Sequence, residues 1–281
     1  MPVLRLPALR GTNHMSSTGQ FFTDGAAYDQ MMGRWSRRVG DVFIGWLGPP
    51  EKSRWLDIGC GTGAFTEQIA ENCGPASVIG IDPSPEQLAF AEQRIITAEF
   101  QVGDAQALAY PDNTFDIAVM ALAIHFIPDP GKAVSEMARV LRQGGLGAAY
   151  VWDYTKAGSP TAPLAAGMRA IGLDPPAPPS RNATSLAVLK ELWTRAGFVQ
   201  IDTRSISITV EFASFEEFWN SMTVPAGPAG KAVAEMPADS RARLRSTLEA
   251  RLSPTANGRI VYKAVANAIR GRKTSEVDRH R

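Results

Sequence analysis

Short apolar runs alternate with helical patterns through the first half of the chain. The segments between these runs, such as 64–71, place apolar residues at helical spacing. Strands that alternate with helices form βαβ units, so the pattern predicts an α/β fold with a doubly wound, mostly parallel sheet. The predicted buried strands are 55–58, 78–82, 100–102, 115–122 and 146–152.

Residues that cap or break helices mark the ends of the helical segments. Ser84-Pro85-Glu86-Gln87 combines a capping box with proline in the first turn, so a helix begins there. Asp129-Pro130 begins another helix, which we expect to end at Gly144-Gly145. Ahead of the first strand, residues 20–47 have a helical pattern that Gly48-Pro49-Pro50 ends.

The pattern changes after residue 153. Residues 158–179 contain six prolines and three glycines and predict a loop or lid. A long strand, a helical excursion and a returning strand then predict an antiparallel pair with a helical cap inserted, which brings the sheet to seven strands. The segments concerned are a helix at 186–196, a strand at 198–212, a helix from Ser214, a Pro/Gly break at 225–230, a basic helix near 240–252 and a strand at 259–269.

Composition places the chain among ordinary globular proteins of one or two domains. Its 281 residues are 44% hydrophobic and 20% charged, and the longest apolar run, 117–124, is too short to span a bilayer. Two cysteines, Cys60 and Cys73, exclude a disulfide scaffold and an all-cysteine metal cluster. The opening residues carry no secretion pattern, so we expect a cytoplasmic protein whose residues 1–20 are disordered or dispensable.

The net charge of +1 conceals an asymmetry between the two halves. Residues 51–155 carry six Lys/Arg and fourteen Asp/Glu, whereas residues 156–281 carry eighteen and eleven. A basic second half suits RNA or an anionic substrate, and equally a solvated helical face that pairs with the acidic half. The sequence has no aromatic-interleaved basic motif of the kind found in single-strand binders.

The candidate chemistry centres on a glycine-rich turn after the first predicted strand, at residues 57–63. Glycines there let the backbone turn sharply and let a ligand approach the start of the next helix. The spacing also fits a dinucleotide fingerprint, so the turn alone is ambiguous. Asp57 before the first glycine and Asp104 after the third strand argue against a pyrophosphate, because carboxylates suit an ammonium, a ribose and an adenine better.

These motifs resemble those of class I S-adenosylmethionine-dependent methyltransferases, and most of all the subgroup with the ubiquinone/menaquinone-biosynthesis C-methyltransferases. The resemblance covers roughly residues 25–153 and implies a Rossmann-like seven-stranded fold with S-adenosyl-L-methionine as cofactor. It also implies an N-terminal lid helix within residues 20–36. The motifs that carry it are 55–63, 79–84, 103–105, 115–116 and 141–145.

The resemblance assigns roles to individual residues of the cofactor site. Asp57 would help to hold the methionine ammonium, Asp82 would accept both ribose hydroxyls, and Asp104 would accept the adenine amino group. The complete predicted set is Tyr28, Arg34, Asp57, Gly59, Gly61, Gly63, Asp82, Pro83, Asp104, Ala105 and Ala121. We treat Cys60, inside the turn, as a small spacer.

Candidates for the acceptor side are mostly aromatic. His125 follows the fourth strand and is either a general base or a packing and cofactor-contact residue. Methyl transfer from a sulfonium is an in-line displacement, so the chemistry requires no dedicated base. The predicted acceptor contacts, each of which is otherwise a core aromatic, are Trp35, Phe126, Trp152, Tyr154 and Trp219.

The sequence therefore predicts a methyltransferase that acts on a small organic molecule, with O-, N- and C-methylation all open. A cofactor-binding core with its lid helix occupies residues 21–153, and residues 154–281 complete the sheet and supply an acceptor-binding cap. An RNA methyltransferase and a non-catalytic cofactor-binding partner subunit are the alternatives. We expect no metal site, because His14 and His280 are terminal and leave one internal histidine.

Overall fold

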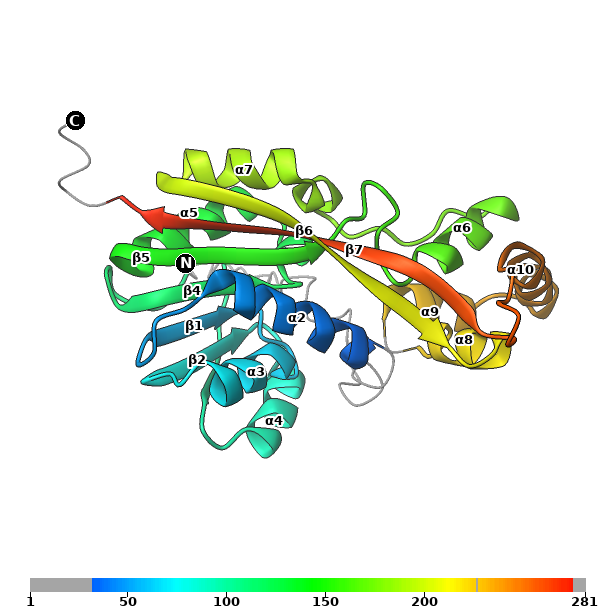
Figure 1. Ribbon diagram of the computed structural model, residues 1–281, viewed down its shortest axis with the longest axis horizontal. Helices are drawn as coiled ribbons and strands as arrows, with labels where there is room; N and C mark the ends of the chain where they lie inside the picture. Colours follow the sequence, from blue (N-terminus) through cyan, green and yellow to red (C-terminus); the bar gives the residue numbers. More distant parts are fainter. Residues whose placement is uncertain (1–31, 226, 275–281) are drawn as a thin grey trace, which may run out of the picture.

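One seven-stranded sheet organises the chain (Figure 1). The structure, a computed structural model, describes residues 32–225 and 227–274. The strand order is β3-β2-β1-β4-β5-β7-β6; the first five strands are parallel, and β7 runs antiparallel to both of its neighbours. The predicted Rossmann-like fold is confirmed. The strands are β1 (Arg54–Ile58), β2 (Ser77–Asp82), β3 (Glu99–Val102), β4 (Phe115–Ala121), β5 (Leu141–Trp152), β6 (Phe198–Phe212) and β7 (Ile260–Lys273).

Helices cover both faces of the sheet, so its central strands are apolar on both sides. In β1, Trp55 joins the core beneath α2 and α3, while Leu56 joins the core beneath α5 and α7. In β4, Val119 lies in the core beneath α2 and α3, and Met120 lies in the core beneath α5 and α7. The helices are α2 (Arg34–Leu47), α3 (Ala64–Asn72), α4 (Pro85–Arg94), α5 (Pro130–Val140) and α7 (Leu186–Arg195).

The predicted helix starts are confirmed, but the predicted end of α5 is wrong. Ser84 caps α4 and Asp129 caps α5, each by accepting a hydrogen bond from a backbone N–H in the first turn. However, α5 ends at Val140, and the residues up to Gly145 belong to β5. Leu141 is buried opposite Phe115 of β4, so strand pairing takes this segment despite its glycines.

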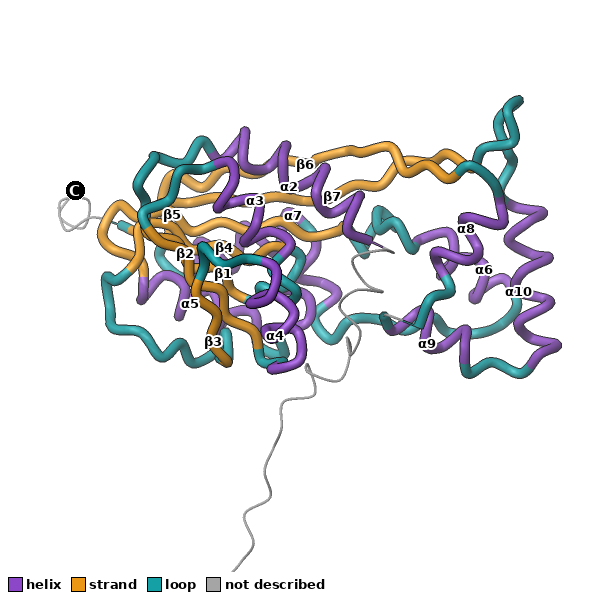
Figure 2. Tube along the Cα trace, turned by 90° about the horizontal axis from the view of Figure 1, so that it is seen from below, coloured by secondary structure: helices purple, strands orange, loops and turns teal. Residues whose placement is uncertain are grey.

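Four helices form a cap at the far end of the long strands β6 and β7 (Figures 1 and 2). Three of them lie between β6 and β7, as the predicted helical insertion requires. The fourth, α6, comes from the segment predicted as a loop, and its Gly167 lies against Leu244 and Leu248 of α10. The cap helices are α6 (Ala162–Ala170), α8 (Phe215–Met222), α9 (Pro228–Ala234) and α10 (Ala238–Arg251).

Two Pro/Gly-rich stretches contain helices that the sequence analysis missed. In α6 and α9 a proline occupies the first turn. Backbone N–H groups of the first turn make no hydrogen bond within the helix, so the proline costs none there. The final strand is also longer than predicted, since it continues to Lys273. No helix within the described ranges is long and apolar enough to cross a membrane.

The expected lid falls only partly within the described residues. The predicted helix at 20–47 is confirmed from Arg34 onward, where α2 packs on α3 and β6. Tyr28 and residues 1–20, predicted to be disordered or dispensable, lie outside the described ranges, so the lid stays a prediction there.

Candidate functional site

A pocket lies at the carboxyl ends of β1, β2 and β4, where ligands bind in doubly wound sheets. The glycine turn after β1 forms one side of it, and α2 contributes Ser36. Residues predicted from separate motifs converge here. Those that line the pocket are Asp57, Gly59, Gly61, Asp82, Pro83, Asp104, Ala105 and Ala121.

Asp57 is the most unusual group in this pocket. Its side chain is fully buried, and Oδ2 accepts a hydrogen bond from Thr66 Oγ1 at 2.7 Å. Oδ1 is buried and has no partner among the described residues. Burial raises the pKa of Asp57 to about 7. A carboxylate oxygen left in this state is suited to a cationic ligand, because a bound cation would offset its desolvation.

The glycine turn joins the ends of β1 and β2. Gly59 has φ +74°, and a Cβ there would lie 2.6 Å from Ala123 Cβ, so a larger residue would force the chain apart. Gly61 donates its N–H to Asp82 Oδ2 at 3.0 Å. The turn thus fixes the Asp82 carboxylate beside the pocket.

Asp82 retains acceptor capacity toward a ligand. Its Oδ1 accepts a hydrogen bond from the Ser84 N–H at 2.9 Å, and each carboxylate oxygen has a second lone pair. Burial raises the pKa of Asp82. Two parallel acceptors on one carboxylate match the spacing of a vicinal diol.

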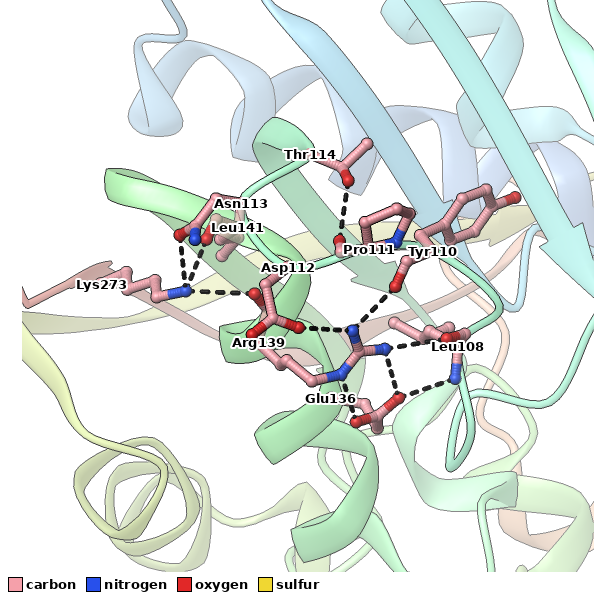
Figure 3. A network of polar contacts seen from close by, with 10 residues as sticks. All are labelled: Leu108, Tyr110, Pro111, Asp112, Asn113, Thr114, Glu136, Arg139, Leu141 and Lys273. Carbon is pink, nitrogen blue, oxygen red and sulfur yellow. Dashed lines mark hydrogen bonds and ion pairs between the residues drawn. The ribbon is translucent and has the colours of Figure 1, made fainter.

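The loop after β3 carries Asp104 and is held by α5. Gln106 donates its backbone and side-chain N–H groups to Asp104, and its Oε1 accepts from the N–H of Asp129, the residue that caps α5. Further along, Glu136 accepts the N–H of Leu108 at 2.8 Å (Figure 3).

Arg139 of α5 completes this attachment. It donates to the carbonyl oxygens of Leu108 and Tyr110 at 2.8 and 2.7 Å and pairs with Glu136 and Asp112 (Figure 3). The backbone of the loop is therefore fixed to α5, and this orients the part of the pocket that carries Asp104.

Two predicted cofactor residues lie elsewhere. Gly63 has φ +78°, and a Cβ there would meet Ile95 Cδ1 at 2.6 Å, so this glycine allows close packing against α4 and the residue after it. Arg34 forms an ion pair with Glu217 of the cap and lies 4.1 Å over the Trp35 ring. Neither residue is among those that line the pocket, and their contact with the cofactor stays a prediction.

A second pocket adjoins the first and shares Leu122 and Phe126 with it. Its walls come from the end of β5, from residues 176–178 and from α9 of the cap. Three predicted acceptor-side residues besides Phe126 line it: His125, Trp152 and Tyr154.

The other two predicted acceptor contacts are core aromatics. Trp35 is buried against Phe212, with ring centroids 5.9 Å apart. Trp219 is buried in the cap beneath the guanidinium groups of Arg241 and Arg245. Neither is among the residues that line the second pocket, and their role as acceptor contacts stays a prediction.

His125 lies in a short 3-10 turn, Ile124–Phe126, and is 2% exposed. Its ring centroid is 4.0 Å from that of Phe126 and 5.2 Å from that of Tyr154. Desolvation lowers the pKa of His125 to about 3, and Nδ1 has no partner among the described residues. The ring is therefore neutral at physiological pH and is a weak base.

Sequence reasoning missed several residues that line the first pocket. Ser36 places a buried hydroxyl without a partner in the described ranges, and Gln68 joins α3 to α2 by donating to the Arg37 carbonyl and Asp41. Leu122 lines both pockets at φ +55°. Such residues lie in ordinary helical or strand patterns, so periodicity alone does not single them out. The described part of the chain contains no group of three or more His, Cys, Asp or Glu side chains placed to hold a metal ion.

Comparison with known proteins agrees with this geometry. Residues 56–149 match the protein family described as "Methyltransferase domain". An uncharacterized methyltransferase of Mycobacterium tuberculosis is 38% identical over 111 residues, covering 39% of this chain and 44% of that protein. A demethylmenaquinone methyltransferase of Bacillus licheniformis is 33% identical over 126 residues, covering 42% of this chain and 54% of that protein. The chain thus spans about half the length of these relatives.

Solved structures share the fold over most of the chain. The YcgJ protein of Bacillus subtilis has a TM-score of 0.59 at 22% identity, covering 85% of this chain and 99% of that one. The Haemonchus contortus phosphoethanolamine N-methyltransferase 2, in complex with S-adenosylhomocysteine, has a TM-score of 0.54 at 20% identity, covering 89% and 57%. Residues 56–149 are therefore similar to a methyltransferase domain, and the fold is that of the solved structures, as the predicted resemblance implies.

Proposed function

We propose that the protein transfers a methyl group from S-adenosylmethionine to a small organic acceptor. The observation that carries this proposal is Asp57, a buried carboxylate with an unmatched oxygen among the described residues, in a pocket that also holds Asp82 and Asp104. The methyltransferase domain and the relatives named above support the same reading.

The residues present fit this cofactor. The Asp57 oxygen suits the methionine ammonium, which would supply a positive counter-charge to the buried carboxylate. Asp82 suits the two ribose hydroxyls. Asp104 and the N–H of Ala105 suit the polar edge of adenine, at the part of the pocket that α5 holds in place through Gln106.

When bound, S-adenosylmethionine would supply a methyl group that an acceptor nucleophile takes in line, as the carbon–sulfur bond breaks and S-adenosylhomocysteine leaves. The protein's contribution is then to align the acceptor and to exclude water. Leu122 and Phe126 lie at the boundary of both pockets, so we place the transfer there. His125 is too weak a base to remove a proton from a hydroxyl, and we assign it a hydrogen-bonding role.

Calorimetry tests the cofactor assignment. S-adenosylhomocysteine should bind, and NAD and NADP should not; binding of the dinucleotides alone would refute the reading of the glycine turn. Transfer of a labelled methyl group would then be followed with a panel of small molecules and with RNA. Label in RNA alone would favour the RNA methyltransferase, and binding without transfer to any acceptor would favour the partner subunit.

A further inference from the structure

Residues 32–36, which include the start of α2, touch both pockets and the cap. Met32 lines the second pocket, and Ser36 lines the first. Between them, Arg34 forms an ion pair with Glu217 of α8 at 3.2 Å, at the end of α2 that faces the cap (Figure 1). We call residues 32–36 the connecting segment, because a shift of this segment would change the walls of both pockets.

Aromatic rings lie beneath the ion pair. The Arg34 guanidinium lies 4.1 Å over the Trp35 ring and 4.9 Å over the ring of Phe212, at the end of β6. Phe212 packs in turn against Phe218 of α8, with ring centroids 5.4 Å apart. Cation–π contacts hold the guanidinium in place beside the carboxylate, so the pair is more than a chance meeting of two mobile side chains.

On its other side, α2 is attached to the wall of the first pocket. Gln68 of α3 lines this pocket and donates to the Arg37 carbonyl at 2.9 Å and to Asp41 Oδ1 at 2.6 Å. The helix therefore joins the first pocket to the cap.

Glu217 is attached to the rest of its own helix. Its Oε2 accepts the N–H of Ala213, and its backbone N–H donates to Ser214 Oγ at 3.2 Å. The same helix carries Met222, which lines the second pocket. A force on the Glu217 carboxylate is therefore passed to the wall of that pocket.

We infer that Arg34 and Glu217 are positioning residues that couple the two pockets. A ligand in the first pocket holds the connecting segment, and the ion pair extends this to the cap wall of the second pocket. The inference rests on the proposed function, because the pockets are read as cofactor and acceptor sites. Linkage is reciprocal, so the ion pair must favour binding in the first pocket by the factor with which the ligand favours the ion pair.

Calorimetry with S-adenosylhomocysteine tests the coupling. Glu217→Gln keeps an oxygen for the Ala213 N–H and removes the charge that pairs with Arg34. The two side chains are 41% and 39% exposed, and such a pair changes an equilibrium constant by about fivefold at most. Glu217→Gln and Arg34→Met should therefore each weaken binding about two- to fourfold, and the double variant no further.

The same measurement separates this role from a direct contact with the ligand. Arg34→Lys keeps the charge and should recover most of the affinity that Arg34→Met loses. If Arg34→Met weakens binding about tenfold or more while Glu217→Gln has no effect, Arg34 contacts the ligand itself and the coupling is overturned.

Hydrogen exchange tests whether the coupling reaches the second pocket. Among the described residues, α9 lines that pocket and not the first, so its backbone amides report on the cap wall. Exchange would be compared without ligand and with S-adenosylhomocysteine at a fixed multiple of the dissociation constant of each protein. The protection that the ligand gives α9 should be about two- to fourfold smaller in Glu217→Gln than in wild type.

Glu216→Gln is the matched control. Glu216 is the neighbouring residue in α8, and its ion pair with Arg245 lies within the cap. This variant should keep the affinity and the α9 protection of wild type. An equal loss of protection in both variants, or no protection of α9 in wild type, would overturn the coupling.

The wild-type measurement separates the two levels of failure. If S-adenosylhomocysteine binds wild type and every variant equally, the coupling is wrong and the proposed function stands. If S-adenosylhomocysteine does not bind wild type, the proposed function fails and the coupling falls with it.

Discussion

Asp57 should make the ligand-free protein less stable as pH rises. Its folded-state pKa of about 7 exceeds the reference value of 3.8. Between these values the folded protein binds more protons than the unfolded protein, so the free energy of unfolding falls with increasing pH. At 1.36 kcal/mol per pKa unit, the full shift corresponds to about 4 kcal/mol lost by pH 8, of which about 2 kcal/mol is lost between pH 5.5 and pH 8.

Asp57→Asn should remove this loss, because the amide keeps an oxygen for Thr66 Oγ1 but does not ionise. Urea unfolding without ligand would be measured at pH 5.5 and pH 8 for both proteins. Relative to wild type, the variant should gain about 2 kcal/mol on going from the lower to the higher pH. Parallel pH profiles, within about 0.5 kcal/mol, would refute the argument that burial of an unmatched carboxylate dominates its titration.

The same variant should bind S-adenosylhomocysteine poorly, since the charge that opposes folding is the one we assign to ligand binding. In the wild type, the ionised fraction of a group with a pKa of about 7 rises roughly eightfold between pH 6.0 and pH 7.5. If Asp57 must be ionised to hold the ammonium, the affinity should rise by the same factor. Calorimetry at the two pH values checks this, and a flat profile would contradict the assignment.

Three further perturbations probe the rest of the site. Asp82→Ala should weaken S-adenosylhomocysteine binding by about 2–4 kcal/mol in calorimetry, and an affinity within threefold of wild type would exclude the ribose role. Gly63→Ala should lower unfolding stability by about 1–3 kcal/mol in urea titrations, because of the positive φ and the contact with Ile95, and leave affinity nearly unchanged. Arg139→Met should cost about 2 kcal/mol of stability and speed hydrogen exchange at the Leu108 amide; unchanged exchange would show that the loop is held by other contacts.

Most of the fold could be predicted from the sequence because local signals agree with tertiary pairing. Ser84 and Asp129 are helix caps both by sequence and in the structure. Where the two conflict, pairing decides: Gly144-Gly145 suggests a helix end, but Leu141 pairs with Phe115 and the segment becomes part of β5. The local sequence of a segment does not show which distant strand it pairs with, so a helix end that depends on strand pairing cannot be predicted from it.

The proposed cofactor site could be predicted from the sequence better than the proposed acceptor site, for a related reason. Asp57 and Asp82 lie at the carboxyl ends of the parallel strands β1 and β2, and Asp104 follows β3, so the topology itself brings them to one edge of the sheet. Acceptor residues depend on how the cap packs. Trp152 ends a strand and Trp219 lies in a helix, and the sequence predicts both as acceptor contacts, yet one lines a pocket and the other lies under two arginines.

Leu122 connects the end of a sheet strand to the boundary between the two pockets. It directly follows β4 and has φ +55°, a conformation unfavourable for a side chain with a Cβ, and its N–H donates to the Tyr150 carbonyl at 2.8 Å. The hydrogen bond to β5 helps to hold this conformation, and in it the residue lines both pockets. A relaxed strand would alternate its side chains between the two faces of the sheet, each of which is filled by its own core. Leaving the strand at Leu122 instead directs the chain across the carboxyl edge, where the next turn supplies Phe126 to the same boundary. The unfavourable backbone conformation of Leu122 therefore accompanies the placement of the first and second pockets side by side.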